Sequence, residues 1–252
     1  MEKYFKIRED LSMQYKGHTL YRIEATKDLP DHDVKKGDIG GWIEKEENLG
    51  GNAWIADKAK VCDNAIVSDN AKICDWAEVY GNAVVCDNAI VYGNAEVCDD
   101  AIIRNNAKIY GSARVSGNAA VSAYANVYGS AGVFGNAKVW DNTEIYGTAL
   151  VYNNANIFGN AKIYGNVQVF ANADVFGDIL QHENDCKNIA GERYNITITP
   201  NYIKIGCQYH TKEKWWNFTD REILKMAGKE GLKWWKTWKP ILQLICKTQI
   251  TN

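Results

Sequence analysis

A repeat of six residues runs without interruption through half of the chain and constrains the fold more than any other feature. Alanine recurs at every sixth position from residue 53 to residue 173, and only Thr143 and Val167 depart from it. Two positions later each repeat carries valine or isoleucine, which defines 21 hexads over residues 53–178. A period of six matches neither the 3.6 residues of an α-helical turn nor the seven residues of a coiled-coil heptad. The repeat must therefore be a structural unit.

Each hexad has the pattern of a short strand followed by a corner. In Ala107 to Ser112, Ala107 and Ile109 are two apart and share one face of a strand, while Lys108 points to the other face. The next two residues are usually Gly, Asp or Asn followed by Asn, which tolerate turn and left-handed conformations. Three strands and three corners close a triangular coil of 18 residues, so the 21 hexads predict seven stacked coils.

These hexads, for example Val91-Tyr92-Gly93-Asn94-Ala95-Glu96, resemble the hexapeptide repeat of left-handed parallel β-helices. The resemblance covers half of the chain and implies the left hand of the coils. The chain departs from the family pattern after the aliphatic position, where the family usually has a small or acidic residue and this chain often has an aromatic one. It also lacks the long protruding loops of many enzymes in the family.

Three parts are expected. We predict an all-β left-handed parallel β-helix of about seven coils over residues 53–178, an N-terminal β cap over residues 1–52, and a small C-terminal α+β unit over residues 179–252. The composition changes sharply at the last boundary. Residues 179–252 hold 12 Lys and Arg against 7 Asp and Glu, and five of the nine tryptophans, whereas the hexads hold 8 against 13. The C-terminal unit is therefore basic and the repeat region acidic.

The C-terminal unit has recognisable local signals. Residues 193–206 read as a β-hairpin with Pro200-Asn201 at its turn. Thr219 and Glu222 form a capping box, which predicts a helix from about residue 220. A second helix is expected from about Lys229 until Pro240 kinks or ends it.

Residues 18 apart should lie above one another, so the sequence predicts columns along the coils. Aromatic residues recur on all three edges, which predicts stacking between coils or, alternatively, an aromatic surface for a planar or sugar ligand. One outward strand column is apolar and another is charged. An apolar stripe on the surface favours an oligomer interface or a cover by one end of the chain. The three aromatic columns are Tyr92, Tyr110, Tyr128, Tyr146 and Tyr164; Phe134, Tyr152 and Phe170; and Trp140, Phe158 and Phe176. The apolar column is Ile66, Val84, Ile102 and Ala120. The charged column is Lys60, Glu78, Glu96 and Arg114.

The seven cysteines do not predict a disulfide framework or a metal site. Their number is odd and no secretory signal is seen, so reduced thiols are expected. Four of them are spaced by twelve residues, which places successive thiols at different corners, and the two that share an edge lie about 10 Å apart. We therefore predict no metal site; the stacked aspartates Asp57 and Asp75, and Asp69 and Asp87, are interpreted as turn residues. The four spaced cysteines are Cys62, Cys74, Cys86 and Cys98.

The histidines are the main argument about enzymatic activity. Many proteins of the hexapeptide family are acyltransferases with a histidine general base, which must titrate near neutral pH. The four histidines of this chain are His18, His32, His182 and His210, and none lies within the hexads. The family resemblance therefore does not carry an acyltransferase activity to this chain.

The densest cluster of reactive side chains follows the predicted hairpin. Cys207 and His210 are three apart and are the candidate nucleophile and base, a weak signal without a third group to orient them. The segment IGCQYHTKEKWWNF is similar to the C-terminal cap of hexapeptide-repeat proteins of bacteria and phages that are labelled transferases. Its lysines and tryptophans suit a nucleotide or single-stranded nucleic acid, or equally a solvated helix face over a tryptophan-rich core. The candidate binding residues are Tyr209, Lys212, Lys214, Trp215 and Trp216.

Together these observations favour a non-enzymatic binding or scaffold protein without a cofactor, encoded by a phage and acting on a host protein or a nucleotide. The alternative is an acyltransferase-like enzyme that uses acyl-CoA at a site near the C-terminal unit. No run approaches the roughly 20 apolar residues of a membrane span, so we expect a cytoplasmic protein that does not bind a membrane. A homo-oligomer, either a trimer or a dimer, is the expected assembly.

Overall fold

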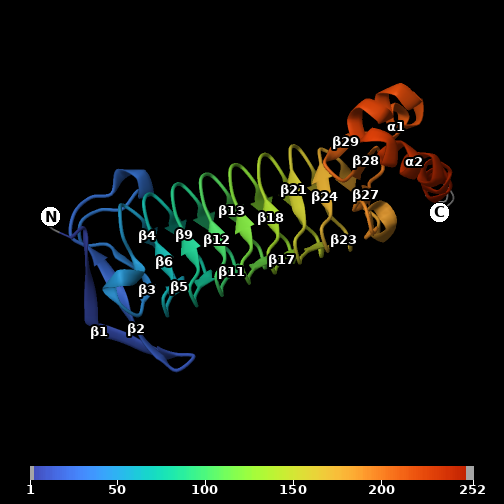
Figure 1. Cartoon of the computed structure of the whole chain (residues 1–252). Helices are drawn as coiled ribbons and strands as arrows, with labels where there is room; N and C mark the ends of the chain where they lie inside the picture. The colour runs from blue at the N-terminus through green and yellow to red at the C-terminus, as the bar shows by residue number, and fades with distance from the viewer. Residues whose placement is uncertain (1–2, 248–252) are drawn as a thin grey trace.

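The hexads form a parallel β-solenoid. The computed structural model describes residues 3–247, in which stacked coils carry a β-hairpin cap at one end and a partly helical unit at the other (Figure 1). Neighbouring strands of the hexads are 18 residues apart and pair in parallel, as when Ile90 pairs with Lys72 on one side and Lys108 on the other. The predicted fold class and coil length are confirmed.

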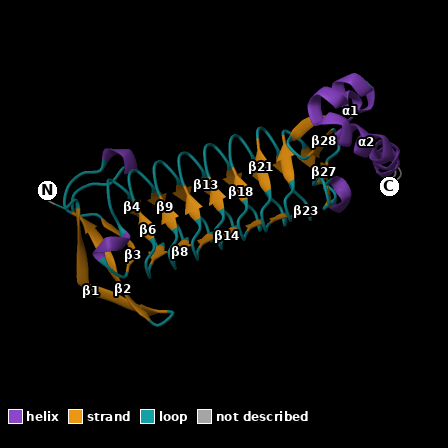
Figure 2. Cartoon of the chain, in the orientation of Figure 1, coloured by secondary structure: helices purple, strands orange, loops and turns teal. Residues whose placement is uncertain are grey.

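Three sheets make the walls of the solenoid (Figure 2). The ten-stranded sheet contains β1 (Phe5–Tyr15), β2 (His18–Ala25), β3 (Ile39–Ile43), β5 (Lys60–Val61), β8 (Glu78–Val79), β11 (Glu96–Val97), β14 (Arg114–Val115), β17 (Gly132–Val133), β20 (Leu150–Val151) and β23 (Gln168–Val169). The eight-stranded sheet contains β4 (Trp54–Ile55), β7 (Lys72–Ile73), β10 (Ile90–Val91), β13 (Lys108–Ile109), β16 (Asn126–Val127), β19 (Glu144–Ile145), β22 (Lys162–Ile163) and β25 (Ile179–Leu180). The seven-stranded sheet contains β6 (Ile66–Val67), β9 (Val84–Val85), β12 (Ile102–Ile103), β15 (Ala120–Val121), β18 (Lys138–Val139), β21 (Asn156–Phe158) and β24 (Asp174–Phe176).

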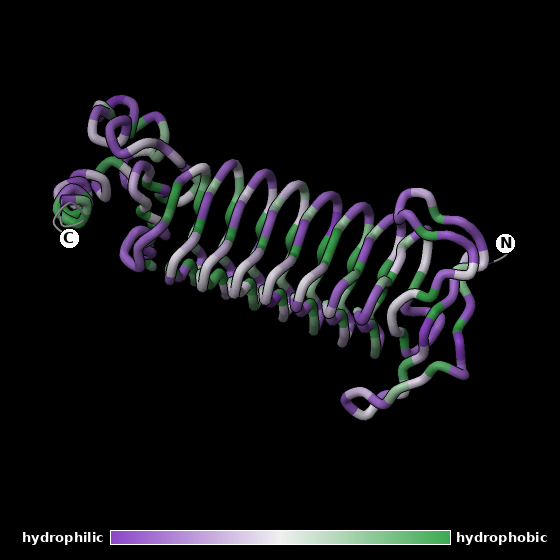
Figure 3. The backbone as a smooth tube through the Cα atoms, turned by 180° about the vertical axis from the view of Figure 1, so that it is seen from behind, coloured by the Kyte–Doolittle hydropathy of each residue, from purple (hydrophilic) through white to green (hydrophobic). Residues whose placement is uncertain are grey.

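The core is a column of small and β-branched side chains. Ala107 and Ile109 have no exposed surface, whereas Lys108 between them is exposed. The same alternation recurs in each coil, and the hydrophobic segments repeat along the walls in Figure 3. A coil is too thin to enclose a core alone, so each one is stabilised by its neighbours.

The backbone conformation at the corners explains why Gly, Asp and Asn recur there. Asp75 and Asp99 have φ angles of 58° and 59°, in the left-handed region that most residues avoid. The Asp75 carboxylate accepts the backbone N–H of Gly93, and that of Asp99 accepts the N–H of Gly117, both at 2.9 Å. An aspartate at a corner thus caps the corner of the next coil. A Cβ added to Gly111 would lie 2.9 Å from the backbone nitrogen of Gly129, which is too close for any larger residue without a shift.

The aromatic column of the later coils stacks as predicted. Neighbouring rings have centroids 4.8 to 4.9 Å apart and are inclined by 8° or less. On the other two edges, Trp140 stacks on Phe158 and Tyr152 stacks on Phe170. The ring of Phe134 instead lies over Gly132. The rings of the long column are those of Tyr92, Tyr110, Tyr128, Tyr146 and Tyr164.

The N-terminal part continues the solenoid as well as capping it. β3 pairs in parallel with β5, and η2 (Glu46–Asn48) leads to Leu49, which bridges Val67 in parallel. At the other end β25 pairs with β22 beyond the last hexad. The eight-stranded sheet therefore makes about eight turns, one more than the hexads alone predict. η1 (Pro30–His32) belongs to the loop before β3.

The antiparallel β1–β2 hairpin leaves the end of the solenoid and its tip reaches back along the ten-stranded sheet (Figure 1). Tyr15 and Lys16 at the tip contact Glu78, and Lys16 also lies 4.4 Å from the centre of the Tyr80 ring. The hairpin thus covers the first two residues of the charged column, Lys60 and Glu78, and leaves Arg114 exposed. The apolar column stays exposed, with 44% of Ile66 accessible, and its use in an oligomer stays a prediction.

The C-terminal unit has a second core. After η3 (Glu183–Asp185), four antiparallel strands, β26 (Lys187–Ile189), β27 (Ile196–Ile198), β28 (Tyr202–Ile205) and β29 (Gln208–Thr211), pack on α1 (Lys212–Asn217) and α2 (Asp220–Lys247). The predicted Pro200-Asn201 turn joins β27 to β28, and the Thr219 capping box precedes α2. α1 was not predicted. α2 breaks at Gly228, which has φ 69° and ψ −174°, so a helical segment does follow near Lys229; Pro240 does not end it, because the helix reaches Lys247.

Polar contacts fix this unit on the last coil. The Tyr209 hydroxyl donates to the Phe176 carbonyl at 2.9 Å. Asp178 is 1% exposed and accepts hydrogen bonds from the Thr199 hydroxyl and, at 2.7 Å, from the Asn201 amide. None of the helices in residues 3–247 is both long enough and apolar enough to cross a membrane.

Candidate functional site

Two of the candidate binding residues converge on one pocket of the C-terminal unit. Lys212, the first residue of α1, and Trp216 on the same helix line a pocket of about 530 Å³. The end of α2 forms the opposite part of the lining with Cys246 and Lys247, and Asp185 of η3 lies at the rim. The sequence segment that is richest in lysine and tryptophan thus contributes to a cavity of this unit.

The pocket combines positive charge with an aromatic wall. Burial lowers the pKa of Lys212, because removing an ammonium from water disfavours its charged form. An anion in the pocket would oppose that shift. Trp216 is held by its stack on Trp235, with centroids 6.4 Å apart and planes inclined by 14°, and its carbonyl accepts a hydrogen bond from Lys239 at 2.8 Å. The ring is therefore a fixed surface.

The one carboxylate at the rim is already engaged. Oδ2 of Asp185 accepts the backbone N–H groups of Gln181 and His182 at 2.7 and 2.8 Å. These bonds stabilise the turn of η3 and reduce the negative charge that the carboxylate presents to the pocket.

The structure places the other candidate binding residues outside this pocket. Tyr209 contacts the last coil, and burial raises its pKa. Trp215 is a core residue, 3% exposed, whose indole N–H donates to the Ile203 carbonyl at 2.7 Å. Lys214 extends over the Phe218 ring. The cluster that the sequence groups together is therefore divided between a pocket, a core and a junction.

The structure places the side chains of Cys207 and His210 in different surroundings, and their catalytic role stays a prediction. Cys207 is exposed in the turn between β28 and β29, at the rim of a separate cavity of about 110 Å³. The His210 ring packs edge-on against Trp215 and Phe218, with centroids 5.2 and 5.0 Å away. Burial is the larger cause that lowers the His210 pKa, and the positive charge of Lys214 lowers it further. No hydrogen bond joins the two side chains within residues 3–247.

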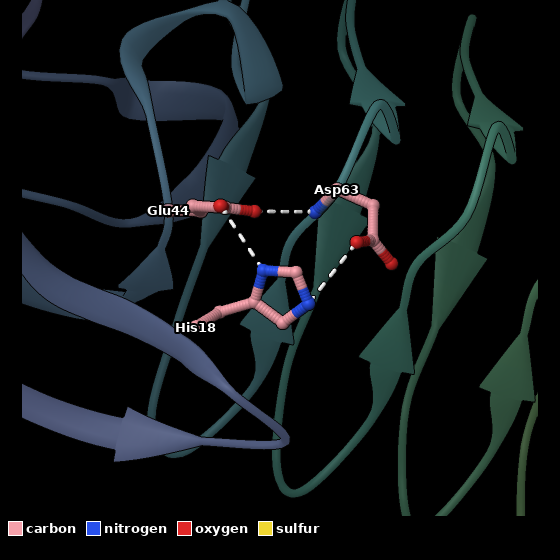
Figure 4. A group of neighbouring side chains, drawn as sticks. All are labelled: His18, Glu44 and Asp63. Atoms are coloured by element: carbon pink, nitrogen blue, oxygen red, sulfur yellow. Dashed lines mark hydrogen bonds and ion pairs between the residues drawn. The ribbon is translucent and has the colours of Figure 1, made fainter.

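One of the four histidines, although it lies outside the hexads, makes contacts with the solenoid that the sequence did not predict. His18 at the start of β2 inserts between two carboxylates (Figure 4). Its Nδ1 is 3.0 Å from Oε1 of Glu44, and its Nε2 is 3.2 Å from Oδ1 of Asp63. Oε2 of Glu44 also accepts the backbone N–H of Asp63 at 2.7 Å. The hydrogen bond with Glu44 is the main reason that the His18 pKa is raised.

The position of His18 follows from the hairpin and not from the hexads. Lys16 and Gly17 both have positive φ, 47° and 88°, which is typical of a two-residue hairpin turn. The sequence signal that was available for this hairpin is the Lys16-Gly17 turn between two runs in which apolar and polar residues alternate. Because both ring nitrogens face carboxylates, His18 is suited to hold the hairpin on the solenoid.

The stacked aspartates have a structural explanation that the sequence only suggested. Oδ2 of Asp57 accepts the N–H of Asp75, and Oδ2 of Asp69 accepts the N–H of Asp87, at 3.2 and 3.3 Å. These carboxylates are used by the corners. The prediction of no metal site stays a prediction.

Comparison with known proteins gives no relative by sequence. No protein-family model matches the chain, and no curated protein matches it. The functional argument therefore depends on the geometry alone.

Proposed function

We propose that the protein is a non-enzymatic binding protein that takes a nucleotide in the pocket lined by Lys212 and Trp216. The observation that carries the proposal is the convergence of a half-buried lysine and a fixed indole ring on one cavity of about 530 Å³. A phosphate would lie at the lysines, and a base would stack on Trp216. Base stacking on an aromatic side chain contributes about 1–3 kcal/mol.

The surroundings of the histidines support a binding role over an acyltransferase role. His18 is engaged by two carboxylates, His32 bonds the Asn52 carbonyl, and His210 packs between aromatic rings. Within residues 3–247 no histidine side chain is hydrogen-bonded to a hydroxyl or a thiol, which is the arrangement that activates a nucleophile.

The parallel coils with their 18-residue spacing support a place among the left-handed hexapeptide-repeat β-helix proteins. A phage setting, a cytoplasmic location and a host-protein partner are part of the same proposal and await their own tests.

Isothermal titration calorimetry with ATP, AMP and cyclic AMP tests the nucleotide site. We expect W216A and K212Q each to weaken binding at least fivefold, from the loss of stacking or of one ion pair with phosphate. K225Q is the matched control, since Lys225 is exposed on α2 away from the pocket. Equal nucleotide affinity of W216A, K212Q and the wild type would contradict the site, and so would failure of all three nucleotides to bind.

An assay of acetyl-CoA consumption with amine and hydroxyl acceptors tests the non-enzymatic part. We expect no turnover above the uncatalysed rate. Turnover that disappears in H210A would establish the acyltransferase alternative, with His210 as its base.

A further inference from the structure

A polar groove runs along the eight-stranded sheet of the solenoid and shares no lining residue with the C-terminal pocket. Its volume is about 500 Å³, and it spans several coils. Its floor is the outward column of that sheet, and its wall is a corner column of asparagines. The floor residues are Lys72, Ile90, Lys108 and Asn126, and the wall residues are Asn70, Asn88, Asn106 and Tyr124.

The two lysines of the groove have no ionic partner. Within residues 3–247 the ammonium groups of Lys72 and Lys108 make no hydrogen bond or ion pair, although the backbones of both residues are paired between coils, whereas Lys60 pairs with Glu78 and Lys162 with Glu144. The strand register places Ile90 between Lys72 and Lys108. The two lysines therefore belong to alternate coils whose backbones are about 10 Å apart, with the apolar side chain of Ile90 between them.

The wall of the groove has unused groups as well. Tyr124 stands where the neighbouring coils have asparagine, is 61% exposed, and stacks on no other ring of the described residues. Asn70 donates Nδ2 to Asn88 at 3.2 Å, but its Oδ1 is buried and accepts no hydrogen bond from the rest of the described structure. The other aromatic rings on the solenoid edges are mostly stacked, so Tyr124 is available as a flat surface for a ligand.

We propose that this groove binds an acidic linear glycan that carries one carboxylate on alternate sugars. The chain of sugars lies along the solenoid axis, with its carboxylates on Lys72 and Lys108, its hydroxyls on the asparagine amides, and a sugar face on Tyr124. The site is independent of the nucleotide pocket, and either one stands if the other fails.

A glycan fits this surface better than a peptide. Peptides that bind sheets usually add a strand at an exposed edge, where backbone groups are free. Here the backbone groups of the floor are already paired between coils, as when Ile90 N–H donates to the Ala107 carbonyl at 3.0 Å. A ligand must therefore be recognised through side chains, which amides and a phenol ring do well for hydroxyls and sugar faces.

The groove also has a defined end. Asp31 and His32 of η1 line it beside Lys72. Burial lowers the His32 pKa, because it disfavours the charged imidazolium, and Nε2–H donates to the Asn52 carbonyl at 2.8 Å. The Asp31 carboxylate repels an anion at that end. The acidic groups of the ligand are thereby directed to the two lysines and away from η1.

Microcalorimetry of the full chain with three probes tests the proposal: a hyaluronan hexasaccharide, a neutral hexamer of N-acetylglucosamine, and an extended peptide with aspartate at every third position. We expect binding of the hyaluronan hexasaccharide that weakens as salt is added. K72Q and K108Q should each weaken it about fivefold, as for loss of an exposed ion pair, and Y124A about threefold. K138Q is the matched control, because Lys138 is exposed on the seven-stranded sheet.

Each other outcome overturns the proposal. Unchanged affinity in the K72Q/K108Q double variant would show that the acidic sugars bind elsewhere. Equal binding of the neutral hexamer would remove the role of the lysines, and binding of the peptide alone would assign the groove to acidic proteins. Failure of every probe to bind would leave the groove without a glycan function. Thermal unfolding of each variant, unchanged from the wild type, excludes a folding defect.

Discussion

The tyrosine column offers a direct measurement of what stacking between coils contributes. Tyr110 stacks on Tyr92 and on Tyr128, with both pairs of centroids 4.8 Å apart and planes inclined by 6° and 1°. Each aromatic pair contributes about 0.5–1.5 kcal/mol beyond the burial of its area. Replacing Tyr110 with leucine keeps an apolar side chain and removes two such pairs. We expect it to lower the free energy of unfolding by about 1–3 kcal/mol.

A double-mutant cycle separates stacking from other losses. In the Tyr110→Leu and Tyr128→Leu cycle, the coupling energy should be about 0.5–1.5 kcal/mol, the value of the one pair that both changes remove. Tyr110 and Tyr146 are the control pair, because Tyr128 lies between them and they are about 10 Å apart. Their effects should be additive within about 0.5 kcal/mol.

Urea unfolding followed by far-ultraviolet circular dichroism gives the required free energies, provided that all variants share one denaturant dependence, since repeat arrays can lose cooperativity. A coupling energy for Tyr110 and Tyr128 that does not exceed that of Tyr110 and Tyr146 would refute the argument. The column would then be stabilised by burial of each ring alone.

Three further predictions concern the cap, the junction and the core. His18 has a raised pKa, so its hold on the hairpin should be fully present below about pH 6.5 and lost as the pH rises through its folded-state pKa. Hydrogen-exchange protection factors of β1 and β2, each referred to the intrinsic exchange rate at the same pH, should fall over that range, and protection factors that do not change with pH would contradict it. Asp178→Ala should destabilise the C-terminal unit by about 3 kcal/mol, measured by proteolysis and thermal unfolding against the exposed control Glu183→Ala, because it removes buried charge-assisted hydrogen bonds. Ile109→Ala should cost about 2–5 kcal/mol in urea unfolding, and a loss below about 1 kcal/mol would mean that the coils close over the cavity.

The solenoid could be predicted from the sequence because its contacts repeat the sequence period. Ala107 and Ile109 face inward in the structure as their spacing requires, and residues 18 apart pair. The extra turn was missed because β3 and β25 lack the hexad pattern and pair with the coils through their backbones.

The candidate site was only partly predictable, because its contacts join segments far apart in the chain. Lys212 and Trp216 were identified, but the pocket is completed by Lys247 at the far end of α2. The contacts of His18 with Glu44 and Asp63 reach residues 26 and 45 positions away, and no local pattern specifies where the tip of a hairpin comes to lie. α1 was missed although Thr211 caps it, because the capping box lacks its acidic partner.

The coil also sets the steps by which this molecule could change in length. Removing 18 residues takes out one full coil, which would shorten the distance between the hairpin cap and the C-terminal unit by about 4.8 Å and leave their mutual orientation unchanged. Removing a single hexad keeps the inward alternation but turns everything beyond it by a third of a revolution about the axis. The number of whole coils therefore sets the distance between the two ends of the solenoid, and the number of hexads sets the direction in which the far end faces.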